Sequence, residues 1–300
     1  MVESTNKRVS IIMVLLDGLG DYSNQTETGR QTTLQQANMP TLDALINSKQ
    51  SYFGVHDPVQ SGLACGSDTA HMSLFGYDPL KIYDGRGMLE SMGSGLVTKV
   101  GDIAFKSNFA FMNTETRILE RRRVDREFPE WGIPLCAAIT GLRVPGYPDH
   151  IVECQYATEH RCAIKVSGPR LSSLITGNDP LKDNLPIVRC EATDPEDPDS
   201  VFTAELIEKL SDTLTSVLLE HPINQQRKKQ GFPYTNMITL RGAGRRIEAT
   251  SFKDKHQLKP FMIAPTAIIR GVGLTFGMEL LDDVEGMTGY YNSNLQGKCL

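Results

Sequence analysis

The chain has 300 residues, of which 40% are hydrophobic and 22% are charged, and its formal net charge is −5. These values are typical of a globular protein with its own hydrophobic core, and they exclude a disordered or collagen-like chain. The charges do not form a long block of one sign, which argues against a nucleic-acid surface. No apolar run reaches the roughly 18 residues of a membrane span.

The start of the chain and its cysteines indicate a cytoplasmic protein. Together with the charge distribution and the lack of a long apolar run, they predict no nucleic-acid or membrane partner. The polar opening, MVESTNKRVS, does not resemble a signal peptide. The six cysteines show no CxxC spacing, so we expect reduced thiols rather than a disulfide framework.

The first predicted element is a strand over residues 9–16, VSIIMVLL. The run is apolar on both faces and rich in β-branched residues, which favours a buried parallel strand. It ends at Asp17 and Gly18, where open α/β sheets hold their ligands. The Asp17 carboxylate is therefore a candidate ligand for a divalent cation, and the alternative is a turn held by an Asx hydrogen bond.

Two helical regions are expected next. Residues 33–47 predict a helix in two pieces, with Pro40 opening the second. A second helix is predicted to start at Ser67, in the sequence GSDTAH. Ser67 is either an ordinary helix cap or a nucleophile at the helix N-terminus, where the positive end of the helix dipole favours a bound anion. His71, one turn later, either faces the same ligand or is a packed helical residue.

The middle of the chain has a different character. A strand is predicted over residues 102–112, and residues 151–158 and 161–168 alternate like strands of a half-exposed antiparallel sheet. Residues 202–221 are amphipathic with helical spacing, and residues 234–240 predict a strand that ends in RGAG.

These elements predict an α/β fold with a mostly parallel core. The core would comprise residues 1–112 and 245–300, because residues 261–273 return to a strand-then-helix pattern. An inserted α+β domain would comprise residues 113–244.

Several arginines are candidates for binding a phosphate or a carboxylate, which suit the planar guanidinium fork. Arg241 precedes a glycine-rich turn, and His160 with Arg161 forms a weaker candidate pair. A cluster lies beside the predicted insertion: Arg121, Arg122, Arg123 and Arg126. The alternative for this cluster is a solvated charged face. Motifs of P-loop, GxSxG and HExxH enzymes are absent from the sequence.

An ordered set of short motifs resembles one enzyme family. It consists of LLDGLGD, GSDTAH, FGYDP, GRG with Glu90, Gly101-Asp102, the asparagine of SNFAF, RRVDREF, YATEHRCAIKVSGP, NDPLKDN, NMITLRGAG and MIAPTAIIRGVG. In this order, the set resembles the archaeal-type 2,3-bisphosphoglycerate-independent phosphoglycerate mutases of the alkaline phosphatase superfamily. The resemblance extends from about residue 9 to residue 291.

The resemblance implies an alkaline-phosphatase-like core with two divalent metal ions, Mn²⁺ or Mg²⁺, and an inserted transferase-like domain. Asp17 matches a metal ligand of the family, and Ser67 matches its nucleophile, which also contacts a metal. The implied reaction interconverts 2-phosphoglycerate and 3-phosphoglycerate through a phosphoserine, in glycolysis and gluconeogenesis. A homo-oligomer is possible. The implied substrate-binding residues are Arg122, Arg123, Arg126, His160, Arg161, Arg241 and His71.

The end of the chain departs from the family pattern. The family completes its metal site with later Asp and His residues, whereas this sequence ends in DDVEGMTGYYNSNLQGKCL. Asp282 and Asp283 are interpreted as structural, and the other histidines lack metal-ligand spacing. We therefore expect a C-terminally truncated core that lacks most metal ligands. Three hypotheses stay open: a mutase, a shortened inactive paralogue that binds phosphoglycerate or a partner subunit, and a metal-dependent phosphatase.

Overall fold

The computed structural model describes residues 10–16, 18–26, 29–52, 54–281, 285–287, 293–294 and 296–299. The chain divides into two compact units, Met1–His56 and Asp57–Leu300. Each unit is described by itself.

The first unit contains a hairpin and two short helices. Strands β1 (Asn24–Thr26) and β2 (Gly29–Gln31) pair antiparallel. Helices α1 (Thr33–Gln36) and α2 (Pro40–Ile46) confirm the predicted two-piece helix, with Pro40 at its first position. Outside Asn24–Thr26, no described residue among 10–56 is buried, so that part of the unit has no hydrophobic core.

The predicted buried strand over residues 9–16 is wrong for the described residues 10–16. These residues form no strand, and Ile12 and Val14 are 88% and 71% exposed. A buried parallel strand needs neighbouring strands at its edges and cover on both faces. Within the described part of the first unit, the only strands are those of the β1–β2 hairpin.

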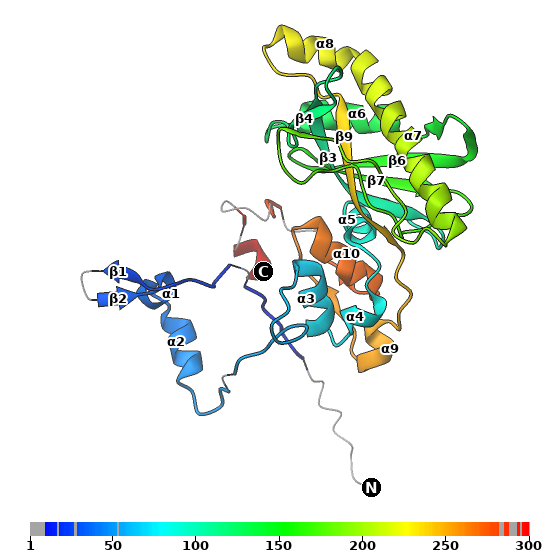
Figure 1. The fold of residues 1–300 in the computed structure, drawn as a ribbon. Helices are drawn as coiled ribbons and strands as arrows, with labels where there is room; N and C mark the ends of the chain where they lie inside the picture. The colour runs from blue at the N-terminus through cyan, green and yellow to red at the C-terminus, as the bar shows by residue number, and fades with distance from the viewer. Residues whose placement is uncertain are drawn as a thin grey trace. The chain divides into compact units, whose positions relative to one another are not determined.

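A seven-stranded sheet forms the centre of the second unit (Figure 1). Six strands run in the order β5-β6-β7-β3-β4-β8, and β9 also pairs with β3. The strands are β3 (Ile103–Met112), β4 (Ile118–Arg121), β5 (Arg143–Val144), β6 (Tyr147–Thr158), β7 (Arg161–Ser167), β8 (Leu185–Pro186) and β9 (Met237–Arg245).

The prediction of a mostly parallel sheet is wrong for the described residues. Every pair in the seven-stranded sheet is antiparallel. The parallel pairing in the described part of the chain is between β10 (Phe261–Met262) and β11 (Glu279–Leu280). A short connection, such as the one between β6 and β7, allows only antiparallel pairing, because a parallel pair needs a long crossover. The fold is therefore mixed α/β with a mostly antiparallel sheet.

The sheet begins before the predicted insertion boundary at residue 113. Strand β3 was predicted to be the last core element, but it pairs with β7 and β9 over most of its length. Strand β9 likewise continues through Arg245. The division into a core and an insertion stays a proposal, and the sheet itself takes in Ile103–Met112.

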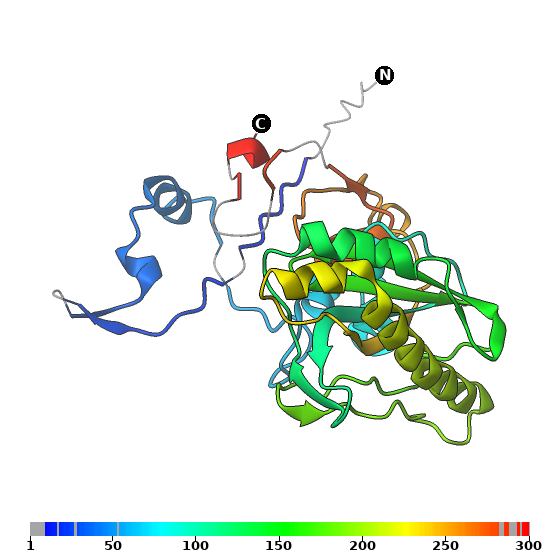
Figure 2. The same cartoon turned by 90° about the horizontal axis from the view of Figure 1, so that it is seen from above.

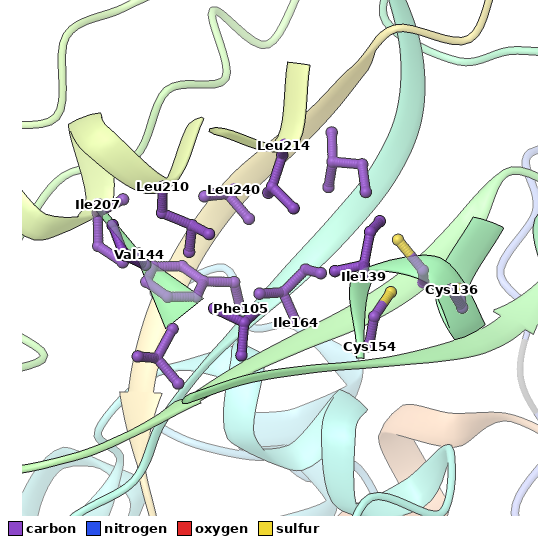
Figure 3. Packing of buried hydrophobic residues seen from close by; sticks show 14 of the residues in the cluster. Phe105, Cys136, Ile139, Val144, Cys154, Ile164, Ile207, Leu210, Leu214 and Leu240 are labelled. Atoms are coloured by element: carbon purple, nitrogen blue, oxygen red, sulfur yellow. The ribbon is translucent and has the colours of Figure 1, made fainter. Parts of the chain in front are cut away.

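Two helices cover one face of this sheet (Figures 1 and 2). They are α6 (Pro129–Ile139) and α7 (Pro198–Glu220), and α7 confirms the helix predicted over 202–221. Figure 3 shows Phe105 and Ile164 of the sheet facing Leu210 and Leu214 of α7. Because residues alternate along a strand, the neighbours of Phe105 point to the opposite face.

Helix α5 (Arg86–Gly93) packs on that opposite face. Its Met88 and Met92 share a cluster with Ala104 of β3. A Cβ atom on Gly87 would lie 2.1 Å from the carbonyl oxygen of Ala104, so the helix backbone lies directly against the strand.

The remaining helices complete the second unit. They are α3 (Ser67–Leu74), α4 (Pro79–Ile82), α8 (Pro222–Lys229), α9 (Phe252–His256), α10 (Ala267–Thr275) and the 3₁₀ helix Gln296–Cys299. Met72 of α3 and Val272 of α10 belong to one buried cluster. Among the described residues, no helix is long and apolar enough to cross a membrane.

Candidate functional site

Ser67 is the first residue of helix α3, as the sequence predicts, but it is not the cap. The N-cap is Gly66, whose backbone N–H donates to Thr69 Oγ1 at 3.2 Å. The Ser67 side chain is half-buried. The position at the start of an eight-residue helix favours a bound anion, because free backbone N–H groups point outward there.

A buried carboxylate follows Ser67 directly. Asp68 is 4% exposed, and Tyr83 Oη donates to its Oδ2 at 2.6 Å. Burial and this hydrogen bond raise the pKa of Tyr83, so the phenol stays protonated. The pair anchors the first turn of α3 to the segment after α4.

His71 contacts its own helix. Its Nδ1 lies 2.6 Å from the carbonyl oxygen of Ser67, and its ring packs edge-on against Phe75. The ring is half-buried. A contact between His71 and substrate stays a prediction.

The described residues do not form the metal site that the resemblance implies. Asp17 lies outside the described residues, as do Asp282 and Asp283. Among the residues that are described, no group of three or more His, Cys, Asp or Glu side chains is placed to hold a metal ion. Ser67 alone does not make a binding site for two cations.

A cluster of charged side chains gathers on the sheet face opposite α6 and α7. Lys106 of β3 pairs in register with Arg241 of β9. Lys106 follows Phe105, which faces the core, so it points to the other face. Arg122 comes directly after β4 and is buried.

Asp179 connects the two arginines. Arg122 donates to it through Nε, 2.6 Å from Oδ1, and through Nη2, 2.8 Å from Oδ2. Arg241 Nε lies 3.6 Å from the same Oδ2 and has no hydrogen-bond partner. The Asp179 side chain is fully buried, whereas that of Arg241 is 32% exposed. The pair therefore reaches from the interior to the surface.

Glu90 connects two further cations. Arg86 Nε and Lys106 Nζ each lie 2.9 Å from Glu90 Oε1. Burial alone would raise the pKa of the Glu90 carboxyl. The positive charges and hydrogen bonds of Lys106 and Arg86 outweigh this effect, so the pKa of Glu90 is lowered. Burial and the repulsion from Arg122 lower the pKa of Arg241. Four cations thus face two carboxylates, and the excess positive charge favours an anion.

His160 and Arg161 lie beside this cluster. His160 is 4% exposed, and neither ring nitrogen has a hydrogen-bond partner. Burial, together with the charges of Arg161, Arg123 and Arg122, lowers the pKa of His160 to about 4. The imidazole is therefore neutral near pH 7. Arg161 is half-buried and pairs with Glu159.

The arginine cluster at 121–126 divides between interior and surface. Arg122 is buried, whereas Arg123 and Arg126 are exposed. Between them, Asp125 pairs with Arg227 of α8 at 2.7 Å, which anchors the segment. The charged-face interpretation therefore applies to the exposed members, whose substrate contacts stay predictions.

Arg241 lies inside a strand rather than after one. The RGAG sequence was interpreted as a turn, but β9 continues through it to Arg245. Gly242 has a φ of +60°, and the register with β3 shifts between Ala104 and Lys106. A Cβ on Gly244 would lie 2.7 Å from the oxygen of Gly85. The glycines therefore permit a bulge and a close backbone contact.

Three residues of the cluster were not singled out from the sequence, namely Asp179, Lys106 and Arg86. Lys106 is a charged residue within a mostly buried strand, IAFKSNFAF, which is a signal of a polar position on a packed sheet. Asp179 lies in NDPLKDN, a motif that matches the family, but only the structure shows that it holds two arginines.

Comparisons with known proteins agree with the motif resemblance. A sequence profile of the family described as 2,3-bisphosphoglycerate-independent phosphoglycerate mutase matches residues 48–224. A mutase of this name from Methanothermobacter thermautotrophicus is 34% identical over 285 residues, which is 95% of this chain and 68% of that protein. A mutase of this name from Sulfolobus acidocaldarius is 32% identical over 298 residues, and the match covers 98% of this chain and 69% of that protein.

Two solved structures are also similar. A cofactor-independent phosphoglycerate mutase from Thermoplasma acidophilum has 32% identity and a TM-score of 0.57, over 71% of this chain and 56% of that one. A protein from Pyrococcus horikoshii has 30% identity and a TM-score of 0.69, over 93% of this chain and 62% of that one. The chain thus spans about two thirds of the length of the curated relatives and less of the two solved chains. On these matches, the chain belongs to the family of 2,3-bisphosphoglycerate-independent phosphoglycerate mutases.

Proposed function

We propose that this chain binds phosphoglycerate at the cationic cluster and interconverts 2-phosphoglycerate and 3-phosphoglycerate. The observation that carries the binding is the excess of positive charge around Arg122, Arg241, Lys106 and Arg86. Phosphoglycerate carries a phosphate and a carboxylate, and both match the guanidinium fork. We also propose substrate contacts for the neutral His160, for the half-buried Arg161 and for the exposed Arg123 and Arg126.

Ser67 is the proposed phosphoryl acceptor. The bond between phosphorus and the ester oxygen of the substrate breaks as a bond to Ser67 Oγ forms. The hydroxyl proton of Ser67 ends on the released glycerate oxygen. Transfer back to the other hydroxyl of the same glycerate reverses these changes and restores Ser67. The free N–H groups at the start of α3 would hold the phosphoryl oxygens.

The bound glycerate must stay on the protein between the two transfers. The cationic cluster supplies this retention, because its charges bind the carboxylate after the phosphoryl group has left. A phosphatase has no such need and releases its product to water. Divalent metals are expected from the family, although the described residues do not form their site.

The test is conversion of 3-phosphoglycerate to 2-phosphoglycerate by the purified chain, with Mn²⁺ and without bisphosphoglycerate. The Ser67→Ala variant is the control. We expect turnover in the native sequence and at least a 1,000-fold loss in the variant, the order found when a catalytic nucleophile is removed. Release of inorganic phosphate without isomerisation would instead assign a phosphatase.

A second candidate function is an inactive paralogue that binds phosphoglycerate. It is favoured by one observation, that the described residues include no group of metal ligands. Calorimetric binding of 3-phosphoglycerate by a folded chain without turnover would assign this function. Turnover that depends on Ser67 would exclude it.

A further inference from the structure

We propose that Asp179 is a positioning residue that holds Arg122 and Arg241 in the arrangement that binds the substrate anion. The inference rests on the proposed function, because it takes the cationic cluster as the phosphoglycerate site. Asp179 is not expected to contact substrate, since its side chain is fully buried beneath the two guanidinium groups.

The contacts of Asp179 use most of its acceptor capacity. Oδ1 accepts from Arg122 Nε and from the backbone N–H of Leu181 at 2.9 Å. Oδ2 accepts from Arg122 Nη2 and lies 3.6 Å from Arg241 Nε. The two-point contact fixes the plane of the Arg122 guanidinium and leaves its Nη1 edge for a ligand. Arg241 is held by charge alone and keeps Nε without a partner.

The loop that carries Asp179 is itself fixed to the sheet. Asn178 exchanges two hydrogen bonds with Leu240, the neighbour of Arg241 in β9, at 2.7 and 3.0 Å. Its Nδ2 also donates to Ser211 of α7 at 3.0 Å. A Cβ on Gly177 would lie 2.1 Å from the oxygen of Leu240, so the loop backbone touches the strand. Asp179 is thereby placed by rigid elements.

The same loop reaches Arg122 by a second route. Asp183 Oδ1 accepts from the backbone N–H of Arg122 at 2.7 Å, and Asn184 donates its N–H to the oxygen of Leu119 in β4. Residues 177–184 therefore connect β4, which leads to Arg122, with β9, which carries Arg241. In the sheet itself, strand β3 separates β4, which Arg122 follows, from β9, which carries Arg241.

Two roles for Asp179 predict opposite changes in affinity. If Asp179 only neutralises charge, then Asp179→Asn adds one positive charge to the site and tightens anion binding. If Asp179 positions the arginines, the same substitution releases both guanidinium groups and weakens binding, although the net charge becomes more favourable. The direction of the change therefore decides between them.

The experiment is isothermal titration of the full chain with 3-phosphoglycerate. We expect Asp179→Asn to raise the dissociation constant at least tenfold. Asp179→Glu keeps the charge but lengthens the side chain by one methylene, and we expect at least a fivefold rise. The control is Asp212→Asn, which removes an exposed carboxylate from α7 that pairs with Arg117, and we expect a change below twofold.

Calorimetry also separates positioning from a purely structural role. A variant with an irreversibly misfolded fraction binds fewer ligands per chain at an unchanged dissociation constant. A reversible unfolding equilibrium raises the apparent dissociation constant, and a urea unfolding curve of the same variant excludes it. A positioning defect changes the dissociation constant of the folded fraction. If Asp179→Asn does not fold, Asp179→Glu decides, and an unchanged dissociation constant in either folded variant overturns the proposal, as does tighter binding.

The proposed function can fail separately. If the native sequence does not bind 3-phosphoglycerate, that function is wrong, and the same variants are titrated with inorganic phosphate. Weaker phosphate binding by both Asp179 variants would still support positioning at an anion site. Binding of neither anion by the native sequence overturns both proposals.

Discussion

His160 combines deep burial with a lack of hydrogen-bond partners, and both follow from its place at the end of a tight turn. Its backbone oxygen accepts from Phe109 N–H at 2.8 Å, which fixes the chain, while the ring lies among Arg161, Arg123 and Arg122. The sequence identifies His160 as part of a weaker candidate pair with Arg161 and of a family motif. Its burial depends on strands β3 and β7 meeting, which residue types alone do not indicate.

The lowered pKa of His160 predicts an acid-sensitive fold. Its pKa is about 4 in the folded chain against 6.5 for an unperturbed imidazole, so the unfolded chain binds more protons between these values. The contribution of His160 to stability is complete above about pH 6.5 and is lost as pH falls towards 4. We expect His160→Gln to flatten this part of the stability profile, as measured by urea unfolding at a series of pH values. An NMR titration giving His160 a pKa near 6.5 would contradict the argument.

At the level of elements, regular periodicity was a reliable guide. The alternation in residues 151–158 and 161–168 and the helical spacing in 202–221 each predicted an element that the structure contains, but residues 162–166 of β7 are all buried rather than half-exposed. Strong patterns succeed because one face of each element is buried in the same core. The apolar run 9–16 has no such pattern of faces, and composition alone did not show whether anything covers it.

Helix α5 was not predicted, because its sequence, GRGMLESMGSG, is a glycine-rich stretch. The glycines have a packing role that needs a partner to be recognised. Gly87 lies against β3, and a Cβ on Gly93 would lie 1.7 Å from the oxygen of Ala267 in α10. A close backbone contact depends on two elements at once, so it cannot be predicted from the sequence of either element alone.

Gly87→Ala separates helix propensity from packing. Alanine is the better helix former by about 1 kcal/mol, so propensity alone predicts a more stable protein. The new Cβ would lie 2.1 Å from the oxygen of Ala104, however, and the backbone cannot yield as a flexible side chain does. We expect a net loss of about 1–3 kcal/mol in the free energy of unfolding in urea. Gly20→Ala, where nothing lies within 4 Å, should change it by less than about 0.5 kcal/mol.

For the whole molecule, the family was predicted better than the architecture. The order of motifs indicated the family that the comparisons show. The parallel core did not follow, because the residues that would begin it, 10–16, are exposed and form no strand here. Motifs record which residues a family retains, whereas a sheet requires all its strands to be paired.

The two units differ so much in burial that they should differ in resistance to proteolysis. Helices α1 and α2 have no buried side chain, whereas the second unit holds a large cluster around Phe105, Phe109 and Leu210. Cleavage requires local unfolding, which costs little where few apolar contacts are lost. We expect trypsin at low concentration to cut first at Arg30 or Lys49 and to leave a stable fragment that begins at Gln50. Mass spectrometry identifies the fragment, and circular dichroism measures its melting temperature against that of the intact chain.

A melting temperature of the fragment within about 3 °C of that of the intact chain would mean that the second unit folds on its own core. A lower value would mean that the first unit contributes to stability, and first cuts within residues 103–245 would contradict the predicted order of cleavage.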